Sequence, residues 1–228
     1  MPDYCFTMHV SDLILKFYKE LRPLEKLPQQ VTVLNPYADP TAWALIKTFY
    51  HKYYGNDVNR VIVFGINPGR FGGGITGIPF TDPIRLEEAC DIPNAFDKRA
   101  ELSSRFIYEM IEAFGGPAAF YSTFYISAVS PLGYMMNSKN LNYYDIPDWK
   151  SLFTDYVVRM ILEQSAFIRK DLAICIGQGQ NLKFLEEINW KHQFFEEIIT
   201  VPHPRWIMQY RLKKKDQFIQ EYLEKLNI

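Results

Sequence analysis

One junction in the sequence limits the possible folds more than any other: a short apolar segment runs directly into a stretch rich in glycine and proline. Residues 61–64 are all hydrophobic, and residues 65–80 read GINPGRFGGGITGIPF. In folds with a parallel sheet, the turn that follows a buried strand lies at the carboxyl edge, where ligands bind. Asn67 is therefore a candidate site residue. Asn, Pro and Gly also form ordinary flexible turns, so an isolated triplet of this kind would carry little weight.

The hydrophobic pattern of the whole chain alternates buried strands with amphipathic helices. Apolar runs without polar alternation predict strands at residues 61–66, 124–129, 172–176 and 198–201. Helical periodicity predicts helices at residues 11–21, 41–53, 102–114, 149–167, 181–188 and 212–226. Strands of this kind are typical of a parallel sheet that is buried on both sides. We therefore predict an α/β fold with a four-stranded parallel sheet flanked by helices on both faces.

Length and composition predict one domain. The 228 residues are 48% hydrophobic, enough to bury one substantial core, and no Pro/Gly/Ser-rich linker divides them. We expect a single domain over residues 1–228, with residues 1–60 as a helical N-terminal extension packed on it. The sequence has no apolar run long enough to span a bilayer and no secretion signal at its start, which predicts a cytoplasmic protein without membrane contact.

The cysteine pattern bears on metals and cofactors. Cys5, Cys90 and Cys175 lie far apart, and none belongs to a C-x-x-C pair. This spacing argues against a zinc site and against an iron–sulfur cluster. We therefore expect neither a metal nor a cofactor.

The charge distribution confines any contact with a polyanion to a local patch, because the formal net charge is only −1. A basic cluster does occur near the C-terminus, where it could hold several phosphates. Alternatively, it is the solvated face of the helix expected at residues 212–226. The cluster comprises Arg205, Arg211, Lys213, Lys214 and Lys215.

Two motifs, each after a predicted strand, resemble the uracil-DNA glycosylase superfamily, most closely its single-strand-selective monofunctional branch. The first is the glycine-rich stretch, which matches G-x-N-P-G-x-F-G followed by T-G-x-P-F, and the second is His203-Pro204. The resemblance covers about residues 61–226 and continues in the same order through shorter matches. These are Ser103-Ser104-Arg105, Gly115-Gly116-Pro117, Ser130-Pro131-Leu132, Lys139-Asn140-Leu141 and Gly177-Gln178-Gly179.

The resemblance implies a monofunctional DNA glycosylase that flips a damaged base out of DNA, without lyase activity and as a monomer. Asn67 would hold the attacking water, and His203 would donate a hydrogen bond to the base oxygen on which charge develops. Phe80 would stack on the extruded base. The remaining base-pocket residues would be Gly65, Ile66, Pro68, Gly69, Phe71 and Ala128. DNA would contact Arg205, Trp206, Met208, Arg211, Lys213, Lys214 and Lys215.

The chain departs from the family pattern at two places. Ala128 stands where the branch carries an Asn that reads the uracil edge, and the family's H-P-S-P-R is shortened to His203-Pro204-Arg205. A catalytically degenerate fold that binds single-stranded DNA or a nucleotide without cleavage therefore stays open. The glycine run could also be a phosphate loop of a nucleotide-binding enzyme, but it lacks the G-x-x-x-x-G-K-[ST] pattern.

Overall fold

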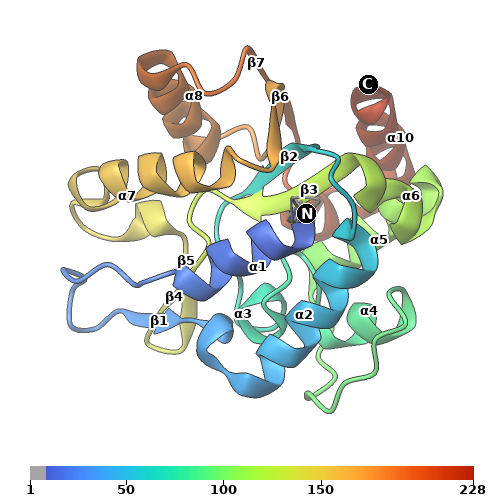
Figure 1. Ribbon diagram of the computed structural model, residues 1–228, viewed down its shortest axis with the longest axis horizontal. Helices are drawn as coiled ribbons and strands as arrows, with labels where there is room; N and C mark the ends of the chain where they lie inside the picture. The colour runs from blue at the N-terminus through green and yellow to red at the C-terminus, as the bar shows by residue number, and fades with distance from the viewer. Residues whose placement is uncertain (1–8) are drawn as a thin grey trace, which may run out of the picture.

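The computed structural model describes residues 9–228; Cys5 and the other residues before position 9 lie outside this range. Its centre is a sheet of four parallel strands in the order β3-β2-β6-β7 (Figure 1). This confirms the predicted α/β class and the four-stranded parallel sheet. The strands are β2 (Arg60–Gly65), β3 (Phe124–Ala128), β6 (Ile168–Ile176) and β7 (Glu197–Val201).

Helices cover both faces of this sheet, because successive strand residues point to opposite sides. On one face, Val63 and Ile126 pack with Met110 and Phe120 of the helices α5 (Leu102–Phe114) and α6 (Gly116–Thr123). The other face packs against the helices α1 (Val10–Glu20) and α7 (Trp149–Gln164). There Tyr125 donates a hydrogen bond to Tyr18 across 3.0 Å.

The N-terminal part of the chain contributes a strand as well as the predicted helices. The helices α1 and α2 (Pro40–Tyr54) lie side by side over the sheet, and the Tyr54 hydroxyl donates to the carbonyl oxygen of Phe124 in β3. Between them, β1 (Thr32–Leu34) pairs antiparallel with β4 (Gly133–Met136), which pairs in turn with β5 (Lys139–Leu141). Residues from before position 60 are thus joined to residues from the middle of the chain.

Several short elements lie in segments where no element is expected from periodicity. These are α3 (Gly73–Thr76), α4 (Pro83–Glu88), α6, α9 (Pro204–Tyr210) and the 3-10 helices η1 (Pro36–Ala38) and η2 (Tyr143–Asp145). The helix expected at residues 212–226 is the 3-10 helix η3 (Leu212–Lys214) followed by α10 (Lys215–Leu226). The helix α8 (Gln180–His192) extends beyond the expected range of residues 181–188.

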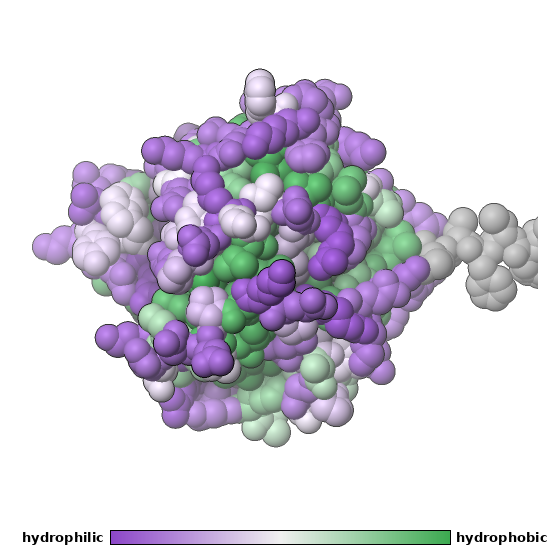
Figure 2. All heavy atoms as spheres, turned by 90° about the vertical axis from the view of Figure 1, so that its left-hand side faces the viewer, coloured by the Kyte–Doolittle hydropathy of each residue, from purple (hydrophilic) through white to green (hydrophobic). Residues whose placement is uncertain are grey.

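The surface is mixed in character. Figure 2 views the side of the molecule that carries α7 and β1, where hydrophobic residues form a central area between hydrophilic ones. Over residues 9–228, no helix combines the length and hydrophobicity needed to cross a bilayer.

Candidate active site

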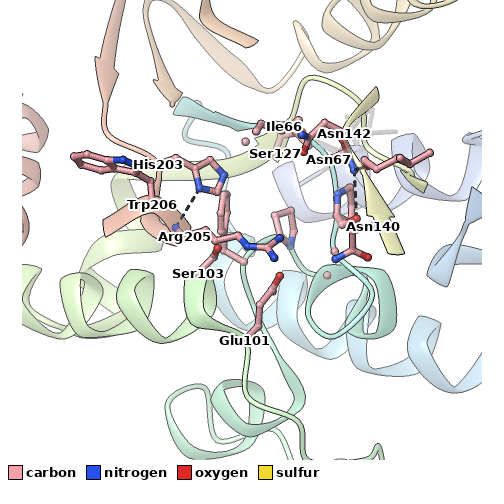
Figure 3. Close-up of a pocket in the computed structure, with 18 of the residues that line it drawn as sticks. Ile66, Asn67, Glu101, Ser103, Ser127, Asn140, Asn142, His203, Arg205 and Trp206 are labelled. Carbon is pink, nitrogen blue, oxygen red and sulfur yellow. Dashed lines mark hydrogen bonds between the residues drawn. The ribbon is translucent and has the colours of Figure 1, made fainter. Parts of the chain in front are cut away.

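A cavity of about 300 Å³ opens at the carboxyl ends of β2 and β3. Its walls come from the glycine-rich stretch, the end of β3, β5, the start of α5 and α9 (Figure 3). In a parallel sheet, the carboxyl ends of strands from distant parts of the sequence lie at the same edge. The turns that follow these strands are therefore close together and form the cavity. Among the predicted site residues, the cavity lining includes Gly65, Ile66, Asn67, Pro68, Gly69, Phe80, Ala128, His203, Arg205 and Trp206.

The side chain of Asn67 is held by backbone groups at the end of β5 and in the residues after it. Its Nδ2 donates to the carbonyl oxygen of Leu141 across 3.0 Å, and its Oδ1 accepts from the backbone N–H of Tyr143 across 2.9 Å. These partners fix which end of the amide is oxygen, because Tyr143 can only donate and the Leu141 carbonyl can only accept. One lone pair of Oδ1 stays free to accept a hydrogen bond from a water in the cavity.

The neighbouring β5 strand also braces the glycine-rich stretch. The Oδ1 of Asn140 accepts from the backbone N–H of Arg70 across 3.1 Å, and the Arg70 guanidinium donates to the carbonyl oxygen of Ser138. The sequence pattern at Lys139-Asn140-Leu141 alone indicates no role. The structure gives it one, because it holds Asn67 and the turn after it in a defined position.

His203 lies at the start of α9 as a neutral donor. Its Nδ1 accepts from the backbone N–H of Arg205 across 3.1 Å and so caps the helix, which leaves the proton on Nε2. Burial, together with the nearby charge of Arg205, lowers the pKa of His203 to about 4. At neutral pH the imidazole is therefore uncharged.

Phe80 lines the cavity next to His203, with a separation of 6.2 Å between the ring centroids. Its backbone has a φ of 53°, an unusual value for an aromatic residue that costs about 1 to 3 kcal/mol. A Cβ added at Gly65 would lie 2.8 Å from the Phe80 ring. Glycine at position 65 therefore allows the ring to lie close to the end of β2.

The end of β3 offers the cavity little that could read a base edge. Ala128 pairs in register with Gly65 and lines the cavity with a methyl group. The Ser127 hydroxyl donates to Gln164 Oε1 across 2.7 Å, and the Ser130 hydroxyl is 2.9 Å from the hydroxyl of Tyr134. Both serine hydroxyls are therefore already engaged with other side chains.

Glu101 is a cavity residue that the sequence reasoning missed. It precedes the first residue of α5, and its backbone N–H donates to Asp82 Oδ2 across 2.8 Å. Burial and the negative charge of Asp82 raise the pKa of Glu101 to about 7, against the opposing effect of Arg205. A helix that starts with Glu gives no functional signal in a single sequence. Ser103, Asn140, Asn142, Gln209 and Tyr210 also line the cavity without having been predicted to do so.

The predicted DNA contacts divide into exposed and buried groups. Trp206 is 40% exposed, and the guanidinium of Arg211 lies 4.9 Å from the centre of its ring. Lys213 and Lys214 are exposed, whereas Lys215 forms an ion pair with Glu109. Met208 is only 6% exposed and belongs to the core.

Phe71, the remaining predicted base-pocket residue, is not among the residues that line the cavity. The centre of its ring lies 4.5 Å from the guanidinium of Arg70 and 5.5 Å from that of Arg99. Within residues 9–228, no group of three or more His, Cys, Asp or Glu side chains is placed to hold a metal ion. Cys90 and Cys175 are free and buried.

Comparisons with known proteins agree with the resemblance drawn from the motifs. The family model described as the uracil DNA glycosylase superfamily matches residues 52–227. The crystal structure of wild-type SMUG2 from Pedobacter heparinus is similar to this chain with 40% sequence identity and a TM-score of 0.92, covering 96% of this chain and 97% of that one. Among curated protein sequences no significant match is found. The chain belongs to the uracil-DNA glycosylase superfamily.

Proposed function

We propose that this protein is a monofunctional DNA glycosylase that hydrolyses the N-glycosidic bond of uracil or of a related deaminated or 5-modified base. The observation that carries the proposal is the meeting of a locked amide, Asn67, a neutral imidazole donor, His203, and an aromatic ring, Phe80, in one cavity at the sheet edge. Family membership supports the same reaction class.

The chemistry follows from these three groups. Asn67 Oδ1 accepts from a water and aims its oxygen at C1′ of the deoxyribose. As the bond from C1′ to the base breaks, its electron pair leaves with the base, and the water oxygen bonds to C1′ while its proton passes to solvent. An oxocarbenium-like sugar accepts a weak nucleophile, so positioning the water suffices and no strong base is needed.

His203 assists the departing base by stabilising its negative charge. A neutral imidazole with its proton on Nε2 can donate a hydrogen bond to the base oxygen directly, without a preceding proton transfer. Because the pKa of His203 is lowered to about 4, the imidazole keeps this form throughout the physiological range. Phe80 supplies a stacking surface, of a kind worth about 1 to 3 kcal/mol per base.

The proposed DNA surface is the exposed side of α9 and η3. Arg205 and Trp206 border the cavity, and Arg211, Lys213 and Lys214 continue the basic surface beyond it. Trp206 is suited to fill the stack that the flipped base leaves. We leave Met208 out of this surface because it is buried.

A hydrolytic reaction without a lyase step also suits the lining, which includes no lysine among the described residues that could form a Schiff base. We propose that the protein acts as a monomer. Cytoplasmic location stays a prediction.

The proposal is tested with labelled oligonucleotides that contain uracil, hypoxanthine or xanthine, single-stranded or opposite each base. We expect strand scission only after alkali, which reports an abasic site made by a glycosylase without lyase activity. Binding without scission would instead establish the degenerate, binding-only function that the Ala128 departure leaves open. Scission before alkali would show a lyase.

A further inference from the structure

The carboxylate of Glu101 is directed into the cavity without a hydrogen bond or ion pair to any residue of the described chain. The backbone of Glu101 is held by a hydrogen bond from its N–H to the carboxylate of Asp82. The side chain extends from the start of α5 toward the glycine-rich stretch. Figure 3 shows the carboxylate directed toward the guanidinium of Arg205, with Asn140 on the side of the cavity opposite His203. None of the proposed catalytic steps uses this group.

Two glycines leave the space that this carboxylate fills. A Cβ at Gly69 would lie 2.7 Å from Oε1 of Glu101 and 3.3 Å from Nδ2 of Asn140. A Cβ at Gly72 would collide with Oε2 of Glu101. The space beside Gly69 is therefore bordered by the carboxylate of Glu101 and the amide of Asn140. Oε1 of Glu101 and Nδ2 of Asn140 are no farther apart than these two distances added together.

The chemistry of a pyrimidine indicates which edge would meet this wall. If His203 donates to O2, the ring stacked on Phe80 has C2 toward the imidazole. C5 is the ring position opposite C2, so it points away from His203 and toward the side of the cavity where Figure 3 shows Asn140. Gly69 lies beside Asn140 on that side.

We propose that Glu101 is a specificity-determining residue, which with Asn140 forms the wall that meets the C5 edge of a flipped pyrimidine and discriminates against negatively charged substituents there. This inference rests on the proposed function. Like charges in a shared, poorly solvated space repel, whereas a neutral carboxyl group can donate a hydrogen bond to such a substituent.

The charged groups that face Glu101 are Asp82, from the turn before α4, and Arg205, from α9. Its neighbours Asn140 of β5 and Ser103 of α5 are uncharged. Because the pKa of Glu101 is raised to about 7, the carboxyl group is neutral below that pH and ionised above it. Below pH 7, Glu101 is neutral and Arg205, which lines the cavity, attracts an anionic substituent. Above that pH, the ionised Glu101 opposes the substituent.

The test compares single-stranded oligonucleotides with one uracil or one 5-carboxyuracil, whose substituent stays ionised from pH 6 to pH 8.5. The measured quantity is the ratio of single-turnover release rates, 5-carboxyuracil over uracil. We expect this ratio to fall by about tenfold or more as the pH rises across that range. In Glu101→Gln it should keep its low-pH value throughout. Glu112→Gln, an exposed change on the same helix, should behave like the unaltered protein.

A second variant guards against a folding defect in the first. Gly72→Ala displaces the carboxylate without removing its charge, and should weaken the pH dependence of the ratio while uracil release continues. A ratio in Glu101→Gln that falls in parallel with the unaltered protein would overturn the inference. If no base were released at any pH, the proposed catalysis would fail, and the ratio of affinities for the two oligonucleotides would decide the role of Glu101 by the same criterion.

Discussion

Replacing His203 by asparagine separates its two roles in the structure. The imidazole accepts from the backbone N–H of Arg205 at the start of α9, and its Nε2–H is the proposed donor to the departing base. Asparagine is among the best residues at the first capping position of a helix, so it keeps the first bond, but it is too short to supply the second. Loss of one preorganised donor of this kind costs about 3 to 4 kcal/mol of transition-state stabilisation.

We therefore expect His203→Asn to slow single-turnover release of uracil by about 10²- to 10³-fold, with little change in the melting temperature. His203→Ala should slow release equally and lose about 1 kcal/mol of stability as well, because the cap is gone. Single-turnover rates and thermal unfolding measure the two effects separately.

Because the charge state of His203 depends on pH, the same variants are also compared as a function of pH. Its pKa is about 4 in the folded protein, whereas the unfolded chain takes up the proton near pH 6.5. The unfolded state thus binds more protons as the pH falls between these values, so His203 lowers stability across that window, and His203→Asn should remove this contribution. A rate loss below about fivefold, or one that disappears between pH 7.5 and pH 5.5, would refute the assignment of a neutral donor.

Three further predictions concern the water, the DNA and the base. Asn67→Ala should abolish most base release with nearly unchanged DNA affinity by fluorescence anisotropy, because Asn67 faces the reacting sugar; equal losses of rate and affinity would mean a structural role. Replacing Lys213 and Lys214 by Ala should weaken binding to every sequence and reduce its salt dependence, whereas the exposed Lys47→Ala should change neither. Ala128→Asn should raise discrimination for uracil over hypoxanthine and xanthine by about 1 to 3 kcal/mol in relative rates, and a folded variant with unaltered ratios would show that another group reads the base.

The central sheet could be predicted because each of its strands contains an apolar run that is buried on both faces. The expected strand at residues 61–66 therefore matches β2 (Arg60–Gly65) to within one residue at each end. The strand β6 begins four residues before the expected range of 172–176, because its first half contains the exposed charged residues Arg169, Lys170 and Asp171. The small sheet of β1, β4 and β5 could not be predicted in this way. Its strands are three or four residues long, and the pairing of β1 with β4 joins segments about 100 residues apart in the sequence.

The residues of the candidate site also fall into those that could be predicted from the sequence and those that could not. The turn after β2 gave Asn67 a local signature, and His203-Pro204 gave another, so both could be found from sequence. Glu101 and Asn140 reach the cavity only because the chain brings α5 and β5 to the edge of the sheet. Their contribution depends on three-dimensional proximity to Gly69, which no spacing in a single sequence reveals.

The central claim is hydrolysis of a glycosidic bond at the cavity formed by Asn67, Phe80 and His203. Mass spectrometry of an oligonucleotide with one uracil, after incubation with the purified protein, tests it most directly. The account predicts free uracil in equal amount to an uncut strand whose mass corresponds to exchange of the base for a hydroxyl group. A strand of unchanged mass, or a strand trapped on the protein by borohydride, would contradict it.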